Sequence, residues 1–307
     1  MKDIHDRGYK KLFSNLEIFR QLITAFVRAS WVKDLDFSKC ELLKESFVSE
    51  RYQNTFKDLI YKIPLHGREL HIVILLEFKA TSYRFVALQM LGYMVDFYRQ
   101  LVESGKGLKK LPPVFPIMLY RGKRRWTAPV SFATLIEGHE LLGKHALRFA
   151  YFPIIANAFS KEELLKIGNI VSTLFLAEVH YDTVLVRREL MAVFDKTTDK
   201  QAIALLLNWF KQILLHGRID EADYKALEHI YHDRKEVAMM LDEAIKKEKK
   251  QFYNQGMEKG MEKGMEKGME KIARLMLARG EPLEKIKSYT GLSADAIKKL
   301  KAKIWQH

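Results

Sequence analysis

The alternation of apolar and polar positions predicts sheet elements in the first half of the chain. Short apolar runs bounded by proline or charge are typical of buried strands, whereas apolar residues spaced three and four apart predict amphipathic helices. Strand patterns cover Phe56–Leu65, Leu70–Phe78, Val114–Tyr120 and Leu147–Ile154, and helical patterns cover Leu16–Arg28 and Arg84–Glu103. The order helix, hairpin, helix, strand, strand predicts an α/β fold, a mixed sheet with helices packed on it.

The second half of the chain is predicted to be mainly helical. Six prolines lie between Pro64 and Pro153, and only Pro282 follows. A long proline-free stretch favours helices, because proline removes a backbone donor and clashes with the preceding turn. We expect helices over Lys161–Val179, Thr183–Phe194, Lys200–Leu215 and Glu221–His232.

A tandem repeat of the tetrapeptide GMEK fills Gly256–Lys271. Its period is close to that of a helix, but each glycine costs about 1 kcal/mol relative to alanine. The glutamates also stack four residues apart with like charge, which is unfavourable. The repeat therefore predicts a marginal helix or a flexible connector, either as a solvated spacer or as a methionine-lined helix for self-association.

The last residues of the chain predict short helices. Gly280 suits a helix end, Pro282 a following helix start, and Ser293 the cap of a final helix. Such a tail is either a helix-turn-helix-like DNA-binding element or a plain helical cap or dimer element. The predicted organisation is a sheet-containing domain over 1–215, a helical connector over 216–255, the repeat over 256–271 and a small helical tail over 272–307.

The two strands before residue 80 predict a tight hairpin. A two-residue turn at Gly67-Arg68, with glycine first, suits a type II′ hairpin. The residues that face each other then have numbers that sum to 135, and one face is wholly apolar, which specifies the register strongly. The pairs on that face are Leu59 with Leu76, Tyr61 with Ile74, Ile63 with Ile72 and Leu65 with Leu70.

The other face of the hairpin carries the candidate chemistry. The same register places Asp58 opposite Glu77, and Lys79 shares the face of Glu77 because side chains alternate along a strand. Two adjacent carboxylates repel each other unless a divalent cation such as Mg²⁺ lies between them. Lys79 would then serve an attacking water or stabilise the charge that develops on a phosphoryl group. The alternative is a surface ion pair at a strand end.

The pattern formed by Asp58 and Glu77-Phe78-Lys79 resembles the PD-(D/E)XK nuclease superfamily. The similarity extends over about residues 3 to 215 to the recombination-promoting nuclease family, whose members also carry a transposase label. The blocks that carry it are HDRGYKKLFSN, KDLIYKI, VILLEFKA, ALQMLGYMVDFY and LPPVFPIMLYRGKRRWTAPV. Family members often have Gln at the position of Lys79, where this chain has the residue of the wider superfamily.

The resemblance implies a restriction-endonuclease-like mixed sheet flanked by helices, with an all-helical C-terminal extension. It also implies a PD-(D/E)XK nuclease-like domain over 1–215 that cleaves DNA with Mg²⁺ or another divalent cation. Asp58, Glu77 and the backbone carbonyl of Phe78 would hold the metal, and Lys79 would be catalytic. Asp6 is a candidate for a further acidic residue from the first helix.

Two further groups of residues are candidates for substrate contact. Gln89 and Tyr93 are four residues apart on a predicted helix and so are neighbours on its surface. They are similar to a Gln-x-x-x-Tyr pair found beside the metal in some nucleases, and this resemblance would make Gln89 part of the catalytic set. The alternative is that Gln89 is solvated and Tyr93 lies in the core. Basic residues flank the strand at 114–120, and those candidates for DNA contact are Lys109 and Lys110 before it and Arg121, Lys123, Arg124 and Arg125 after it. The two basic groups lie at opposite ends of one strand, so they cannot both lie beside the same small site. The alternative for each group is a solvated loop that makes no DNA contact.

Composition narrows the class of protein. The 307 residues include 52 Lys and Arg against 38 Asp and Glu, a net charge of +14 that favours a polyanionic partner. Cys40 is the only cysteine, which excludes a disulfide scaffold and is typical of a reducing, cytoplasmic setting. No apolar run approaches the length of a membrane helix, the start has no signal-peptide pattern, and no P-loop or dinucleotide fingerprint occurs.

Taken together, these patterns predict a metal-dependent DNA endonuclease that promotes recombination or mobile-element transfer. DNA is the expected partner, no membrane is expected, and a homodimer would suit double-strand cleavage. Three alternatives remain open. They are an RNA-directed nuclease, a catalytically silent DNA-binding module of a mobile element, and a protein-binding helical adaptor.

Overall fold

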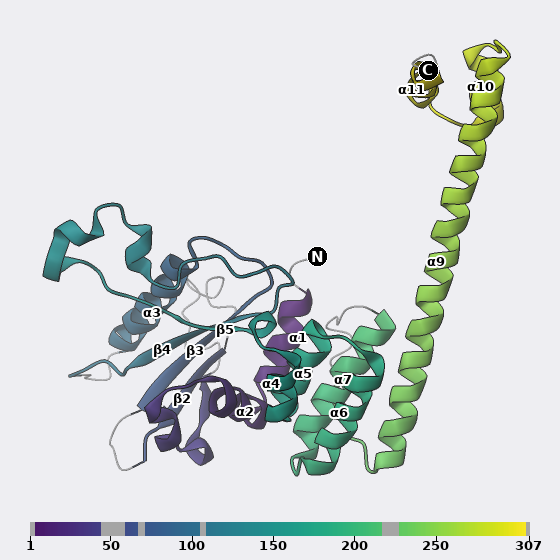
Figure 1. Ribbon diagram of the computed structural model, residues 1–307. Helices are drawn as coiled ribbons and strands as arrows, with labels where there is room; N and C mark the ends of the chain where they lie inside the picture. Colours follow the sequence, from purple (N-terminus) through teal and green to yellow (C-terminus); the bar gives the residue numbers. More distant parts are fainter. Residues whose placement is uncertain (1–3, 44–58, 67–70, 105–108, 217–226, 305–307) are drawn as a thin grey trace. The chain divides into compact units, whose positions relative to one another are not determined.

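The computed structural model describes residues 4–43, 59–66, 71–104, 109–216 and 227–304 (Figure 1). The chain forms two compact units, Met1–Ala244 and Ile245–His307. Within the described residues, no helix is both long enough and apolar enough to cross a bilayer.

A five-stranded mixed sheet forms the centre of the first unit. Its strands are β1 (Glu41–Leu43), β2 (Leu59–Pro64), β3 (His71–Lys79), β4 (Val114–Tyr120) and β5 (Phe152–Ile155), and they follow one another in chain order across the sheet. The first three strands are antiparallel neighbours, whereas β3, β4 and β5 run parallel. The predicted mixed α/β fold with a helical C-terminal region is therefore confirmed. The carboxyl ends of three parallel strands meet at one edge, where Lys79, Tyr120 and Ile155 lie in register.

The register of the β2–β3 hairpin is the predicted one. Leu59 pairs with Leu76, Tyr61 with Ile74, and Ile63 with Ile72. The predicted turn at Gly67-Arg68 and the Leu65–Leu70 pair lie outside the described residues. On the apolar face, Tyr61, Ile63, Ile74 and Leu76 are fully buried.

Helices cover both faces of the sheet (Figure 1). On the apolar hairpin face, Phe19 of α2 (Leu16–Phe26) stacks on Tyr61 with ring centroids 3.7 Å apart, and Phe78 of β3 contacts Tyr9 and Phe13 of α1 (Ile4–Phe13). On the other face lies α3 (Val86–Glu103). A core there joins residues of α3, the strands and the segments that follow β4: Ile60, Val86, Met90, Phe97, Met118, Tyr120, Trp126 and Tyr151.

Helices and short turns complete the first unit. They are η1 (Ser30–Asp34), η2 (Phe37–Lys39), η4 (Phe132–Leu135), η5 (His139–His145), η6 (Ala156–Ala158), α4 (Lys161–Ile167), α5 (Ile170–Val179), α6 (Thr183–Lys196) and α7 (Lys200–His216). In place of the strand expected over 147–154, β5 covers only the four residues 152–155. The boundaries of α3, α6 and α7 lie within two residues of the predicted ones.

Two helix predictions in this unit are wrong. The single helix expected over Lys161–Val179 breaks at Gly168, which adopts a left-handed conformation with φ 57°, and Asn169 then caps α5. Of the helix expected over Glu221–His232, residues 217–226 lie outside the described part, and residues 229–232 are not helical. The buried Asn208 holds this stretch in a non-helical conformation, because its amide donates to the carbonyls of Leu227 and His229 and its oxygen accepts from Tyr231.

The GMEK repeat is helical. It lies inside α9 (Arg234–Ala278), where Met257, Met261 and Met265 are exposed. The helical alternative is therefore the one that the structure supports. In the second unit, the end of α9 packs with α10 (Leu283–Thr290) and α11 (Ala294–Ile304) around a small core of Ala273, Ile286, Ile297 and Leu300. A DNA-binding role for this tail stays a prediction.

Candidate active site

Glu77 and Lys79 lie on the face of β3 that α3 covers. The Glu77 side chain is only 4% exposed, and the Lys79 side chain is 20% exposed. The ammonium of Lys79 forms an ion pair with Oε1 of Glu77. A buried carboxylate is costly unless it is paired and hydrogen-bonded, so this pairing allows an acidic residue inside the sheet.

Helix α3 brings an amide to the same carboxylate. Gln89 donates from Nε2 to Oε1 of Glu77 at 3.4 Å, and the same nitrogen donates to the hydroxyl of Tyr93. Burial, and then the charge of Glu77, raise the pKa of Tyr93 to about 12, although the hydrogen bond from Gln89 acts in the opposite direction. Tyr93 therefore remains a neutral hydroxyl at physiological pH.

The apolar pattern of α3 explains why Gln89 and Tyr93 reach the strand. Val86, Met90 and Phe97 are buried in the core between α3 and the sheet. Gln89 and Tyr93 are four residues apart and so are neighbours on the helix surface beside that buried stripe. Packing of the stripe thus directs both polar side chains toward Glu77.

The backbone carbonyl of Phe78 points away from β4 and toward the β2 side of β3, where it could bind a ligand. The carbonyl of Lys79 accepts a hydrogen bond from the backbone N–H of Arg121 at 3.0 Å, on the β4 side. Successive carbonyls along a strand point in opposite directions, so that of Phe78 points toward the side of β2. The first described residue of β2, Leu59, pairs with Leu76, two residues before Phe78.

The acidic residues predicted to join Glu77 are not placed. Asp58 lies outside the described residues, and so does the side chain of Asp6. Among the residues that are described, no group of three His, Cys, Asp or Glu is arranged to hold a metal ion. The Glu77 carboxylate and the Phe78 carbonyl are hard oxygen donors of the type that Mg²⁺ prefers, and they fit such an ion if a second carboxylate completes the set.

The predicted basic residues separate into two locations. Lys109 and Lys110 precede the first residue of β4, whereas residues 121–125 follow its last residue. A strand of seven residues spans about 20 Å. Only the segment 121–125 therefore shares a sheet edge with Lys79.

Arg121 lies on the opposite face of the sheet from Glu77. Its guanidinium is 5.1 Å from the centre of the Tyr9 ring, and the Tyr9 hydroxyl donates to Glu178 of α5. Burial raises the pKa of Glu178 to about 7, although the Tyr9 hydrogen bond and the charge of Arg121 act against the rise. No local sequence pattern predicts this cluster, because Tyr9 and Glu178 are 169 positions apart.

The fold and the Glu77–Lys79 pair define a mixed α/β protein with an acid–lysine pair on the central strand of its sheet. The family model described as "Putative transposase, YhgA-like" matches residues 3–204, and the chain belongs to this family. The predicted family resemblance is thus confirmed.

Two curated relatives are similar over most of the chain. Recombination-promoting nuclease RpnA of Escherichia coli (strain K12) is 22% identical over 306 residues, which cover 95% of each protein. Recombination-promoting nuclease RpnD of Escherichia coli O157:H7 is 22% identical over 222 residues, which cover 69% of this chain and 82% of the relative. No solved structure matches the chain significantly.

Proposed function

We propose that this chain is a metal-dependent nuclease that hydrolyses phosphodiester bonds of DNA and acts in recombination or mobile-element transfer. The observation that carries the proposal is the buried Glu77 carboxylate, which receives both the Lys79 ammonium and the Gln89 amide at the carboxyl edge of the sheet. The names of the two relatives, both recombination-promoting nucleases, support the same reaction and the same biological role.

In this proposal, Glu77, the Phe78 carbonyl and Asp58 hold the cation. Asp58 belongs to the set because it directly precedes Leu59, the residue paired with Leu76. A bound Mg²⁺ would supply positive charge to the scissile phosphate and lower the pKa of a bound water. Two carboxylates and a backbone carbonyl leave room for water and phosphate oxygens in an octahedral shell.

The side chains around Glu77 have separate roles in the proposed hydrolysis. The water oxygen forms a bond to phosphorus, the ester bond to the leaving oxygen breaks, one water proton passes to solvent, and the leaving oxygen takes up a proton. Lys79 stabilises the negative charge that grows on the phosphate oxygens. Gln89 fixes the orientation of the Glu77 carboxylate, and Tyr93 in turn fixes Gln89.

Incubation of the purified full-length chain with supercoiled plasmid tests the proposal. We expect nicked and linear products with Mg²⁺ or Mn²⁺ and none with EDTA. Parallel incubations with single-stranded DNA and with RNA identify the nucleic acid that is cut. Cleavage of RNA alone would favour the RNA-directed alternative, and binding to DNA without any cleavage would favour the catalytically silent module.

A further inference from the structure

The loop after β4 is held in a fixed conformation at the carboxyl edge of the sheet. A Cβ atom on Gly122 would overlap the Tyr120 hydroxyl and the backbone carbonyl oxygen of Ala80, so only glycine allows this close approach. The Tyr120 hydroxyl donates to the carbonyl of Arg124 at 2.8 Å. Asn157 donates from Nδ2 to the carbonyls of Gly122 at 2.7 Å and Arg124 at 3.0 Å. The backbone positions from which Lys123 and Arg125 extend are therefore fixed.

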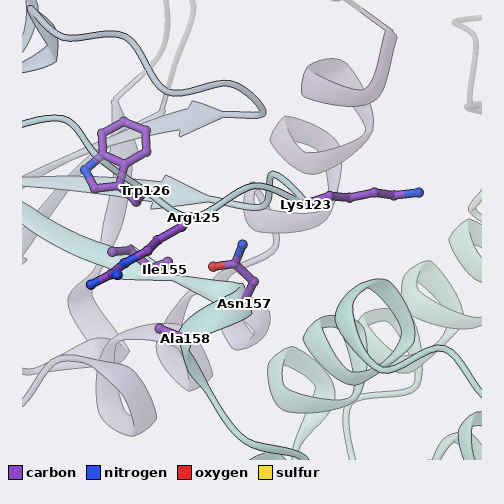
Figure 2. Close-up of a pocket in the computed structure, with 6 residues that line it drawn as sticks. All are labelled: Lys123, Arg125, Trp126, Ile155, Asn157 and Ala158. Atoms are coloured by element: carbon purple, nitrogen blue, oxygen red, sulfur yellow. The ribbon is translucent and has the colours of Figure 1, made fainter.

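An open pocket of about 600 Å³ lies beside this loop and at the end of β5. Its lining residues are Lys123, Arg125, Trp126, Ile155, Asn157 and Ala158 (Figure 2). Figure 2 shows Lys123 and Arg125 extending in opposite directions, with Asn157 between them. Trp126 is buried, packs on Tyr120 and donates its indole N–H to Tyr151, so its ring forms part of the core and is not a stacking platform.

The pocket is cationic. It has two basic lining residues and no acidic one. Within the described part of the chain, no ion pair to a carboxylate involves Lys123 or Arg125. Two cations directed to either side of a small amide fit an extended polyanion better than a compact anion, because they can contact successive charges along it.

The pocket and the Glu77–Lys79 pair share both a face and an edge of the sheet. Ile155 and Trp126 pack in the core on the α3 side, the same side as Glu77. At the edge, Lys79 is in register with Tyr120 and Tyr120 with Ile155, so two strand spacings, about 10 Å, separate β3 from β5. A DNA strand carries a phosphate about every 3.4 Å of helix axis, so one strand presents about three phosphates over this interval.

We infer that the Lys123–Arg125 pocket binds the phosphodiester backbone of the DNA strand that passes over Glu77 and Lys79. This inference rests on the proposed function, since it names the part of the substrate that lies beside the cut. Phosphate contacts of this kind fix the register of the substrate and carry no sequence information. The pocket therefore positions DNA without selecting a base sequence.

Salt-dependent binding of a labelled duplex, measured in EDTA so that no cleavage occurs, tests the inference. Each lost phosphate contact lowers the slope of log affinity against log salt by about 0.9. We expect the variant Lys123→Ala/Arg125→Ala to lower the slope by about 1.8 and the affinity at low salt by about 10-fold. The charge-retaining variant Lys123→Arg/Arg125→Lys should keep the wild-type slope.

The matched control is Lys144→Ala/Arg148→Ala, which removes the same two residue types from exposed positions that precede β5, at the opposite edge of the sheet. A wild-type slope in the pocket variant, or an equal loss in this control, would overturn the inference.

The outcomes also separate the inference from the proposed function. If the wild-type chain binds DNA and the pocket variant loses slope as expected, but the wild-type chain cuts nothing with metal, the proposed function fails and the inference stands. If the wild-type chain cuts DNA but the pocket variant binds with the wild-type slope, the inference fails and the proposed function stands. Absence of any DNA binding at low salt contradicts both.

Discussion

Lys79 forms an ion pair with Glu77, two residues earlier on the same central strand, and Gln89 from α3 donates to the carboxylate oxygen that accepts the ammonium. The pair lies inside the protein, where removal of one partner leaves an uncompensated charge. Glu77 and Lys79, which the proposed chemistry needs, therefore also contribute jointly to the free energy of unfolding.

This coupling predicts a non-additive effect on stability. Lys79→Met should lower the free energy of unfolding by about 2–3 kcal/mol, because it leaves the Glu77 carboxylate buried without its cation. The double variant Glu77→Gln/Lys79→Met should lose less than the sum of its single variants. Urea denaturation of the four proteins measures the coupling, and strictly additive losses would show that the pair contributes nothing.

The close approach at Gly122 predicts a large cost for one methyl group. Gly122→Ala should lower the free energy of unfolding by about 1–3 kcal/mol, because the new Cβ overlaps Tyr120 and Ala80. Gly92→Ala on α3 is the matched control, since nothing lies within 4 Å of a Cβ there. That control should be neutral or stabilise by up to about 1 kcal/mol, because alanine is the better helix former. Equal effects of the two substitutions would contradict the description of the loop.

The pKa of Glu178 predicts a specific dependence of stability on pH. Burial raises it from the ordinary 4.5 to about 7, so the folded state binds this proton more tightly than the unfolded state. The associated stability is fully present below about pH 4.5 and is lost as pH rises through 7. Glu178→Gln keeps an acceptor for Tyr9 but cannot ionise.

We therefore expect the variant to gain stability relative to wild type as pH rises from 5 to 8, by on the order of 2 kcal/mol. Chemical denaturation of both proteins at several pH values gives this difference. Parallel profiles for the two proteins would show that Glu178 ionises normally in the folded state.

The helical GMEK repeat predicts tolerance to a change of length. Deletion of one GMEK unit removes four residues from α9, a shortening of about 6 Å, in a region where the methionines are exposed. The melting temperature should change by no more than about 1 °C, because no core contact is lost. A large fall in a calorimetric scan would instead mean that the methionines pack against a partner surface.

The sequence predicted those parts of the fold that local patterns control. Alternating apolar residues specified the pairing of Leu59 with Leu76, because a slip by one residue would turn the apolar face outward. The prolines before the strand at 114–120, the charged residue after it and its apolar run likewise marked a buried strand. The i,i+4 spacing of Gln89 and Tyr93 indicated that they would be neighbours, and the structure adds that Gln89 reaches Glu77.

Features that depend on distant contacts could not be predicted in this way. Gly168 ends α4 because it adopts the left-handed conformation and the Asn169 cap follows, but a glycine in an apolar helical pattern is often tolerated. The buried Asn208 holds residues 229–231 out of a helix through hydrogen bonds that no local pattern encodes. The Tyr9–Glu178–Arg121 cluster joins three elements, and its charge balance exists only after folding.

The most direct test of the account is the rate at which Glu77→Gln cleaves one labelled DNA duplex in saturating Mg²⁺, compared with wild type and with Glu103→Gln. Glu103 is an exposed residue at the end of α3, so its substitution makes the same chemical change away from the site. We predict that Glu77→Gln loses at least about 100-fold in rate while Glu103→Gln retains the wild-type rate. Cleavage by Glu77→Gln at the wild-type rate, with the fold intact by circular dichroism, would contradict the assignment of this carboxylate to catalysis.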